Sequence, residues 1–445
     1  MGETAGTQVA RRQTTTEEAP SAWRTAWTRR FMFGLGLPLF CCGSPKGNGP
    51  GDSVTDGGPP NADDGNAIDA ESPRDSSIVS GGDAAGGGDT GGGSPDVGTS
   101  GGHTLNPISA AVNFPSSWYF NQSIVNASLD PDSSTMITQL SNNGGWGNGN
   151  TFQIDWGIGV IFVNMPSSSI PANSSDTTTS NTTSLGFNGS AAIMPDSDIP
   201  TTVPETSAHV TAPGAGFESS TGSTSDGGDD HNLVFDNKTG YLYELYQANI
   251  QGGALTASGI VIWDPRIDYP VNLRGDVCTS ADASGALMAP LLATPDEVAA
   301  GTITHALRLI LPNSRIQNQQ YVRPATHGTG GSSWATTNGI PYGARFRLHS
   351  SFTLPGASPA AEVFITALKT YGMFLSDGGD IALSVANDDT FEHKWANLLP
   401  NGSHELYGID VTDFDIVAPT SGTYINFTSY TCTRTPASLI PGTTQ

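Results

Sequence analysis

The 445-residue chain carries 42 acidic and 18 basic side chains, which gives it a formal net charge of −24. Because nucleic-acid binding needs an excess of Lys and Arg to neutralise phosphates, we expect no nucleic-acid partner. Charged residues make up only 13% of the chain, whereas Gly, Ser, Thr and Asn are abundant. That balance favours a loop-rich extracellular β protein over a helical cytosolic one.

Residues 28–44, TRRFMFGLGLPLFCCGS, resemble an export signal. Two arginines precede ten mostly apolar residues, a run that fits a signal peptide and is shorter than the roughly 20 residues that span a bilayer. The arginine pair resembles a twin-arginine signal, and the stretch before Cys42 resembles a lipoprotein cleavage site. We expect residues 1–42 to direct export to the cell envelope or the exterior, with Cys42 lipidated and no other membrane contact. A short buried apolar segment, or a start at Met32, remains an alternative.

Residues 43–104 are rich in Gly, Asp, Ser and Pro and contain almost no large apolar side chains. Such a segment cannot offset its chain entropy by burial, so we expect a disordered linker followed by a globular domain at 105–445. Only Cys278 and Cys432 remain in that domain. In an exported protein we expect them to form a disulfide, although two buried thiols remain the alternative.

Apolar alternation of strand period dominates the domain. It predicts a strand at 152–163, long surface loops at 166–228 and a hairpin that joins 232–236 to 241–247. Further strands are expected at 259–263, 305–311, 344–352, 372–376 and 381–385. One helix is predicted from Ser358-Pro359 to Gly372 by its cap, its apolar spacing and its terminal glycine. The predicted fold is mainly β, a β-sandwich-like domain with one packed α-helix and long surface loops.

Between residues 298 and 361 the chain has no acidic side chain but five arginines and three histidines. Alternation along the strand at 344–352 puts Arg345, Arg347 and His349 on one face. With Arg308, they are expected to bind an anionic polysaccharide, since a basic region in an acidic protein suits an anionic ligand. An ordinary solvated strand face is the alternative.

Four residues carry the chemistry expected of a polysaccharide lyase, in which arginine neutralises a uronate while histidine or tyrosine transfers a proton. These candidate catalytic residues are His231, His305, Tyr321 and His327. The basic surroundings also predict an ionised tyrosine. Their spacing specifies no known catalytic motif, so a structural role for each histidine stays open.

Acidic segments flank the basic window, with SDGGDDH at 225–231, SDGGD at 376–380 and NDD at 387–389. Two of their carboxylates could form the acid and base of a glycoside hydrolase, with Asp230, Asp377 and Glu392 as candidates. Glycine-interleaved aspartates can also bind Ca²⁺, although turn formation explains them equally well. We therefore expect no required cofactor and keep Ca²⁺ as the candidate metal.

Several stretches resemble a family of uncharacterised exported bacterial proteins. They are DEVAAG at 296–301, HALR at 305–308, YVRPATH at 321–327, ALKTYGM at 367–373 and the hairpin at 230–245. The resemblance covers roughly residues 105–415 and implies export, but no activity is established for that family. We therefore expect a lipid-anchored lyase or glycoside hydrolase that acts on an extracellular polysaccharide, or alternatively a non-catalytic surface glycan-binding or envelope structural protein.

Overall fold

The computed structural model describes residues 117–165, 182–190, 193–206, 229–267, 269–328, 335, 337–419 and 421–435. The predicted export segment with Cys42 and the predicted linker at 43–104 lie outside these residues. Within the described part, no helix is long and apolar enough to cross a bilayer.

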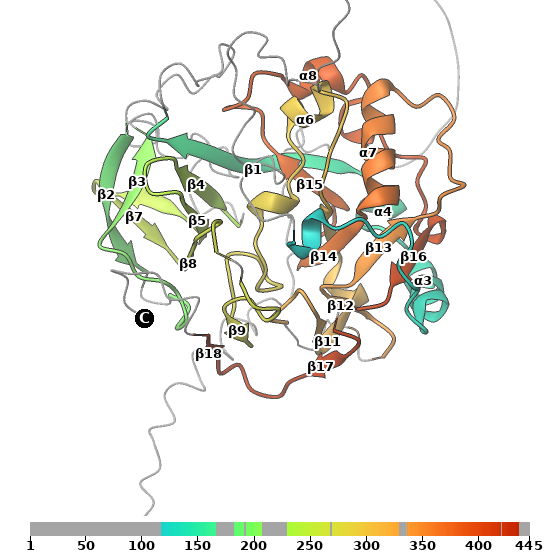
Figure 1. Ribbon diagram of the computed structural model, residues 1–445, viewed down its shortest axis with the longest axis horizontal. Coiled ribbons are helices and arrows are strands. Elements are labelled where there is room, and N and C mark those ends of the chain that lie inside the picture. Colours follow the sequence, from blue (N-terminus) through green and yellow to red (C-terminus); the bar gives the residue numbers. More distant parts are fainter. Residues whose placement is uncertain are drawn as a thin grey trace, which may run out of the picture. The chain divides into compact units, whose positions relative to one another are not determined.

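Nine of the described strands form one mixed sheet in the order β16-β13-β14-β10-β15-β1-β4-β5-β8 (Figure 1). In that order, the strands are Phe414–Val417, Arg345–Leu348, Met373–Gly378, Leu307–Leu311, Leu383–Ala386, Ile154–Val163, Asn232–Asp236, Tyr241–Tyr246 and Gly259–Trp263.

Three smaller sheets complete the described β structure. One contains β3 (Thr202–Thr206), β2 (Thr182–Gly189), β7 (Ala254–Ala257) and β6 (Asn249–Gln251). The second contains β12 (Ile340–Tyr342), β11 (Ile316–Val322) and β17 (Tyr424–Asn426), and the third pairs β18 (Thr433–Arg434) with β9 (Gly275–Asp276). The described α-helices are α3 (Ser133–Asn142), α4 (Gly147–Asn150), α6 (Pro295–Ala299), α7 (Pro359–Thr370) and α8 (Trp395–Leu398).

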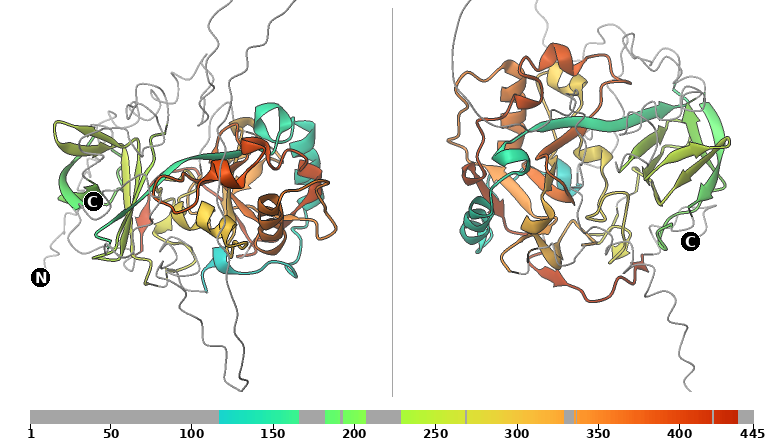
Figure 2. Two further views of the ribbon diagram at one scale, coloured as in Figure 1. Left: turned by 90° about the horizontal axis from the view of Figure 1, so that it is seen from above. Right: turned by 180° about the vertical axis from the view of Figure 1, so that it is seen from behind.

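Strand β1 joins the two halves of the large sheet. Its first half pairs in parallel with β15, beginning at Ile154 opposite Leu383, and its second half pairs in parallel with β4, beginning at Gly159 opposite Asn232. The long strand runs between the two groups of strands, and the view from behind shows the same crossing (Figure 2). Residues 154–158 therefore lie where the two halves meet.

The β4–β5 hairpin forms where the sequence predicts it. The Asp236 carboxylate accepts hydrogen bonds from the Lys238 amide and the Thr239 hydroxyl, and Gly240 takes a positive φ of 75°. These local bonds fix the turn, so the register of both strands follows from four residues.

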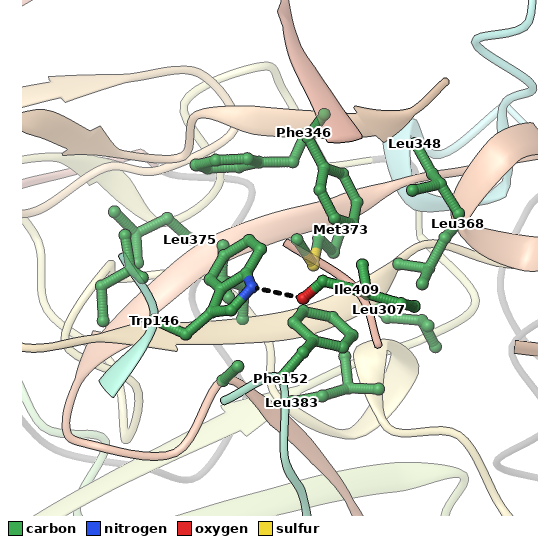
Figure 3. Close-up of a cluster of buried hydrophobic side chains, with 14 of the residues drawn as sticks. Trp146, Phe152, Leu307, Phe346, Leu348, Leu368, Met373, Leu375, Leu383 and Ile409 are labelled. Atoms are coloured by element: carbon green, nitrogen blue, oxygen red, sulfur yellow. Dashed lines mark hydrogen bonds between the residues drawn. The ribbon is translucent and has the colours of Figure 1, made fainter. Parts of the chain in front are cut away.

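Helix α7 is also confirmed. The Ser358 hydroxyl accepts a hydrogen bond from the Ala361 amide, Pro359 occupies the first turn, and Gly372 follows the helix with a φ of 71°. Its apolar face, which includes Phe364 and Leu368, packs into a large core that also contains Trp146. There the Trp146 indole donates to the Ile409 carbonyl at 3.0 Å (Figure 3). Removing a buried ring of this size costs roughly 3–5 kcal/mol.

Two further apolar clusters cover the other half of the sheet. One lies between β1, β4, β5 and β8 and the four-stranded sheet. The other lies on the opposite face, where a buried segment from Ala281 to Leu292 packs against β1, β4, β5 and β8. This buried segment brings the Asp282 carboxylate to the sheet, where it pairs with Arg308 of β10.

The mainly β class is confirmed, but the sandwich is not. Among the described strands, two sheets pack face to face only over the end of β1 and over β4, β5 and β8, whereas the rest of the large sheet carries α7 and loops. The predicted loops at 166–228 contain the strands β2 and β3, in which few apolar residues, such as Leu185 and Phe187 of β2, mark the buried face. The predicted strand at 344–352 is shorter, because it ends at Leu348.

Candidate active site around Arg308

A transverse row of side chains crosses the large sheet. Phe374 of β14 lies between Arg345 of β13 and Arg308 of β10. Ser384 of β15 lies between Arg308 and Asp155 of β1. Because partners on adjacent strands project from the same face, the five side chains share one face of the sheet. Two cations and an acid therefore lie in one row, separated by a phenylalanine and a serine.

Arg308 is the centre of a buried polar cluster. Its Nε donates to Asp282 Oδ2 at 3.1 Å, its Nη2 donates to Asp377 Oδ2 at 2.9 Å, and its Nη1 donates to Ser384 Oγ at 2.9 Å. Arg308 and Asp282 are buried, whereas the Asp377 side chain is 19% exposed. One guanidinium therefore serves two carboxylates, one of which reaches solvent.

Glu244 on β5 contributes a further buried carboxylate to this region. It accepts hydrogen bonds from the backbone amides of Met288 and Ala289 and from the Trp263 indole, all at 2.9 Å. Burial nevertheless raises the pKa of Glu244 to about 7, against the lowering effect of these donors and of Arg308. The acid therefore holds the buried segment against the sheet and can bind a proton near neutral pH.

The carboxyls closest to Arg308 show the same effect. Burial raises the pKa of Asp155 to about 7, although Arg308 and the Gly157 amide oppose the rise, and this side chain is half-buried rather than enclosed. Burial also raises the pKa of Asp282 and of Asp377, again against the influence of Arg308. Raised carboxyl pKa values that gather at a partly open site are typical of proton-transfer sites.

The residues just before β4 reach the same place. Asp229 and His231 have donor atoms that lie within 4.8 Å of each other and of a carboxylate oxygen of Asp377. His231 is 1% exposed, and burial together with Arg308 lowers its pKa to about 3. The imidazole is therefore neutral, and Asp229, His231 and Asp377 are the side chains that could hold a metal ion.

Of the predicted catalytic residues, the structure brings together His231 and Asp377, with Arg308 from the predicted binding set. Asp230 lies between two members of this group and is fully buried, with a φ of 45°. Asp229, from the predicted acidic segment at 225–231, joins them, and the cluster also contains acids that the sequence analysis missed, namely Asp155, Glu244 and Asp282. Two of them had a usable signal, because Asp155 and Glu244 are each flanked by large apolar residues, as a buried carboxylate in a strand would be.

The predicted lyase group of His305, Tyr321 and His327 does not assemble. His305 is fully buried, and its Nε2 lies 3.2 Å from Glu297 of α6. Tyr321 and His327 instead both pack against Phe427. Burial and the carboxylate of Asp276 raise the pKa of Tyr321, so the expected ionised tyrosine is wrong.

His327 is nevertheless connected to the Arg308 cluster by hydrogen bonds through the backbone of Ala283. Its Nδ1 lies 3.0 Å from the Ala283 carbonyl, and the Ala283 amide donates to the Asp377 carboxylate. The remaining hydrolase candidate, Glu392, lies elsewhere, where its backbone amide bonds to Asp296.

The predicted exposed basic face is not formed. The buried guanidinium of Arg345 donates to the carbonyls of Tyr119, Gln122 and Tyr371, and Arg347 donates to the carbonyls of Ile124, Val125 and Ala127. His349 lies 3.5 Å from Asp415. The two arginines thus attach the segment at 119–127 to the sheet, and backbone oxygens accept from all three Arg345 nitrogens and from Nη1 of Arg347, donors that were expected to bind a glycan.

A cavity of about 210 Å³ lies beside this attachment. Arg345 and Arg323 line it together with Phe374, Asp130 and Tyr424. Arg323 is bonded to Asp276, and Asp130 accepts from the Tyr424 hydroxyl at 2.6 Å. The cavity is polar and small, so it suits a group the size of one sugar ring more than a long polymer.

The disulfide between Cys278 and Cys432 is confirmed, with the two Cα atoms 4.4 Å apart. It ties the chain after β17 to the segment that leads to Asp282, and so supports the cluster from outside. No family model, curated protein or solved structure matches the chain. The resemblance to exported bacterial proteins therefore stays a prediction.

Proposed function

We propose that this protein is an exported, lipid-anchored hydrolase that cleaves an extracellular polysaccharide, and that the cluster around Arg308 is its active site. One observation carries the proposal. Asp229 and His231, which precede β4, meet the distant Asp377 of β14 beside Arg308, next to a half-buried carboxyl on β1 whose pKa is about 7.

Glycoside hydrolysis requires a general acid and a general base, and two carboxyls of the cluster suit these roles. A protonated Asp155 can give its proton to a leaving oxygen, because a pKa of about 7 keeps much of it protonated at neutral pH. Asp377, held by Arg308 at 2.9 Å, is the carboxylate available to accept a proton from water. A hydrolase fits better than a lyase, since the His305 and Tyr321 side chains are occupied by Glu297 and Asp276.

A panel of acidic and neutral polysaccharides tests the proposal, with new reducing ends as the readout and an unsaturated uronate as the sign of a lyase. Asp155→Asn and Asp377→Asn should each lower turnover by about 10²–10⁴-fold. Asp415→Asn, at a half-buried surface position, is the matched control and should retain wild-type turnover. Cleavage that survives both active-site variants would reject the site.

The competing function is non-catalytic glycan binding at the cell surface. The cavity beside Arg345 and Arg323 favours it, because a polar cavity with an aromatic wall can hold a sugar ring. Polysaccharides that bind but are never cleaved would support this function. Export and lipidation rest on residues 28–44, and mass spectrometry of the native protein should find an acylated Cys42.

A further inference from the structure

Three potential metal ligands converge from two distant parts of the chain. Asp229 and His231 precede β4 and Asp377 lies on β14, yet one donor atom of each lies within 4.8 Å of the other two. Such spacing allows a single cation to contact all three, since bonds from nitrogen or oxygen to a transition metal are roughly 2.0–2.2 Å long.

The imidazole of His231 is prepared for coordination. It is 1% exposed and forms a hydrogen bond with the backbone carbonyl of Leu245. An imidazole that donates one ring N–H to a backbone carbonyl turns its second ring nitrogen toward the other two side chains of the group. This is the arrangement by which proteins orient the histidines that bind metals.

The surroundings carry more negative than positive groups. Four carboxyls, those of Asp155, Glu244, Asp282 and Asp377, lie around Arg308, whereas the other cation of the row, Arg345, is bonded to backbone carbonyls. Charges removed from water are costly unless they are paired, so such a site favours either bound protons or a bound cation. A divalent ion at Asp229 and Asp377 would compensate the excess where the cluster reaches solvent.

We propose that Asp229, His231 and Asp377 bind one divalent transition-metal ion such as Mn²⁺ or Zn²⁺. The histidine favours a transition metal over Ca²⁺, since imidazole binds transition metals well and Ca²⁺ takes oxygen ligands. Three protein ligands leave coordination positions for water or a substrate oxygen, as in catalytic sites. The inference rests on the proposed hydrolase site and changes one role in it, since with a metal bound Asp377 would act as a ligand and the metal would lower the pKa of the attacking water; metal binding can be measured without any substrate.

Isothermal titration of the full-length, EDTA-treated protein with MnCl₂, ZnCl₂ and CaCl₂ tests it. We expect one Mn²⁺ or Zn²⁺ per chain, and Ca²⁺ bound about tenfold or more weakly. Asp229→Asn and His231→Gln should each weaken transition-metal binding by on the order of 10–100-fold or more. Because Asp229 is half-buried, its variant should fold even if the His231 variant does not, and circular dichroism checks both.

His393→Gln is the matched control, because His393 is exposed and paired with Asp296, and it should bind metal as the wild type does. No binding of Mn²⁺ or Zn²⁺, tighter binding of Ca²⁺, or full affinity in folded Asp229→Asn would overturn the inference. A protein that binds metal but cleaves no polysaccharide would reject the proposed function alone. Cleavage by a protein that binds no metal would reject the metal site alone.

Discussion

Replacement of Arg308 by methionine should lower the free energy of unfolding far more than replacement of a surface arginine does. The change keeps most of the side-chain length but leaves Asp282 buried and Asp377 without their shared guanidinium. Removal of one partner of a buried ion pair costs about 3–5 kcal/mol, because the remaining charge is left buried without a partner. We expect that loss in the free energy of unfolding above neutral pH.

The loss should depend on pH in a defined direction. Arg308 lowers the pKa of Asp155 and of Glu244, each of which is about 7 in its presence. Without the guanidinium both carboxyls keep their protons to higher pH in the folded state, while they ionise near their ordinary values in the unfolded state. A folded pKa above the unfolded one makes stability fall as pH rises, so the difference from wild type should grow above pH 7.

Urea unfolding at pH 6 and at pH 8.5, with EDTA present to exclude metal, measures the effect. Arg266→Met is the matched control, because Arg266 pairs with Asp264 on the surface and its side chain is 58% exposed. That variant should lose less than about 1 kcal/mol at either pH. If Arg308→Met loses no more than Arg266→Met, or loses the same amount at both pH values, the buried cluster is assigned wrongly.

Three further outcomes follow from the structure. The stability at pH 8 relative to pH 5 should be about 2.5 kcal/mol more favourable in Glu244→Gln than in the wild type, because the pKa of Glu244 lies at about 7 rather than 4.5; identical pH profiles of the two proteins in urea titrations would contradict this. Cys432→Ser should lower the free energy of unfolding by up to about 5 kcal/mol, from the chain entropy of a loop that spans 154 residues. Equal urea midpoints for the oxidised wild type and the serine variant would refute this. Arg345→Ala should lower the thermal midpoint more than Arg347→Ala, because Arg345 is the more buried of the two; the reverse order would show that the 119–127 segment depends mainly on Arg347.

Local patterns predicted local structure well. The β4–β5 hairpin, helix α7 and the strand β8 all have their expected positions, because caps, turns and alternation act within a few residues. The disulfide also followed from the cysteine count. The sheet order did not, since nothing local specifies that β10 lies antiparallel to β15 and parallel to β14.

The basic window shows why the predicted site was partly wrong. The sequence between residues 298 and 361 contains no acid, and this absence suggested arginines without partners. The partners of Arg308 are Asp282 and Asp377, which lie just outside the window on either side. Those of Arg345 are backbone carbonyls, which no composition reveals. Local charge therefore predicted where cations are, but not whether they are available to a ligand.

The same contacts change what the site should attract. Arg308 offers a polyanion no unpaired charge, because its guanidinium is already paired with Asp282 and Asp377, so the anionic glycan expected from the window does not suit the site without help. A divalent ion held by Asp229, His231 and Asp377 would reverse the local sign and give a uronate a partner. The two proposals thus constrain each other. If titration finds no metal, the substrate should be a neutral polysaccharide; if metal binds, acidic substrates should require it and lose turnover in EDTA.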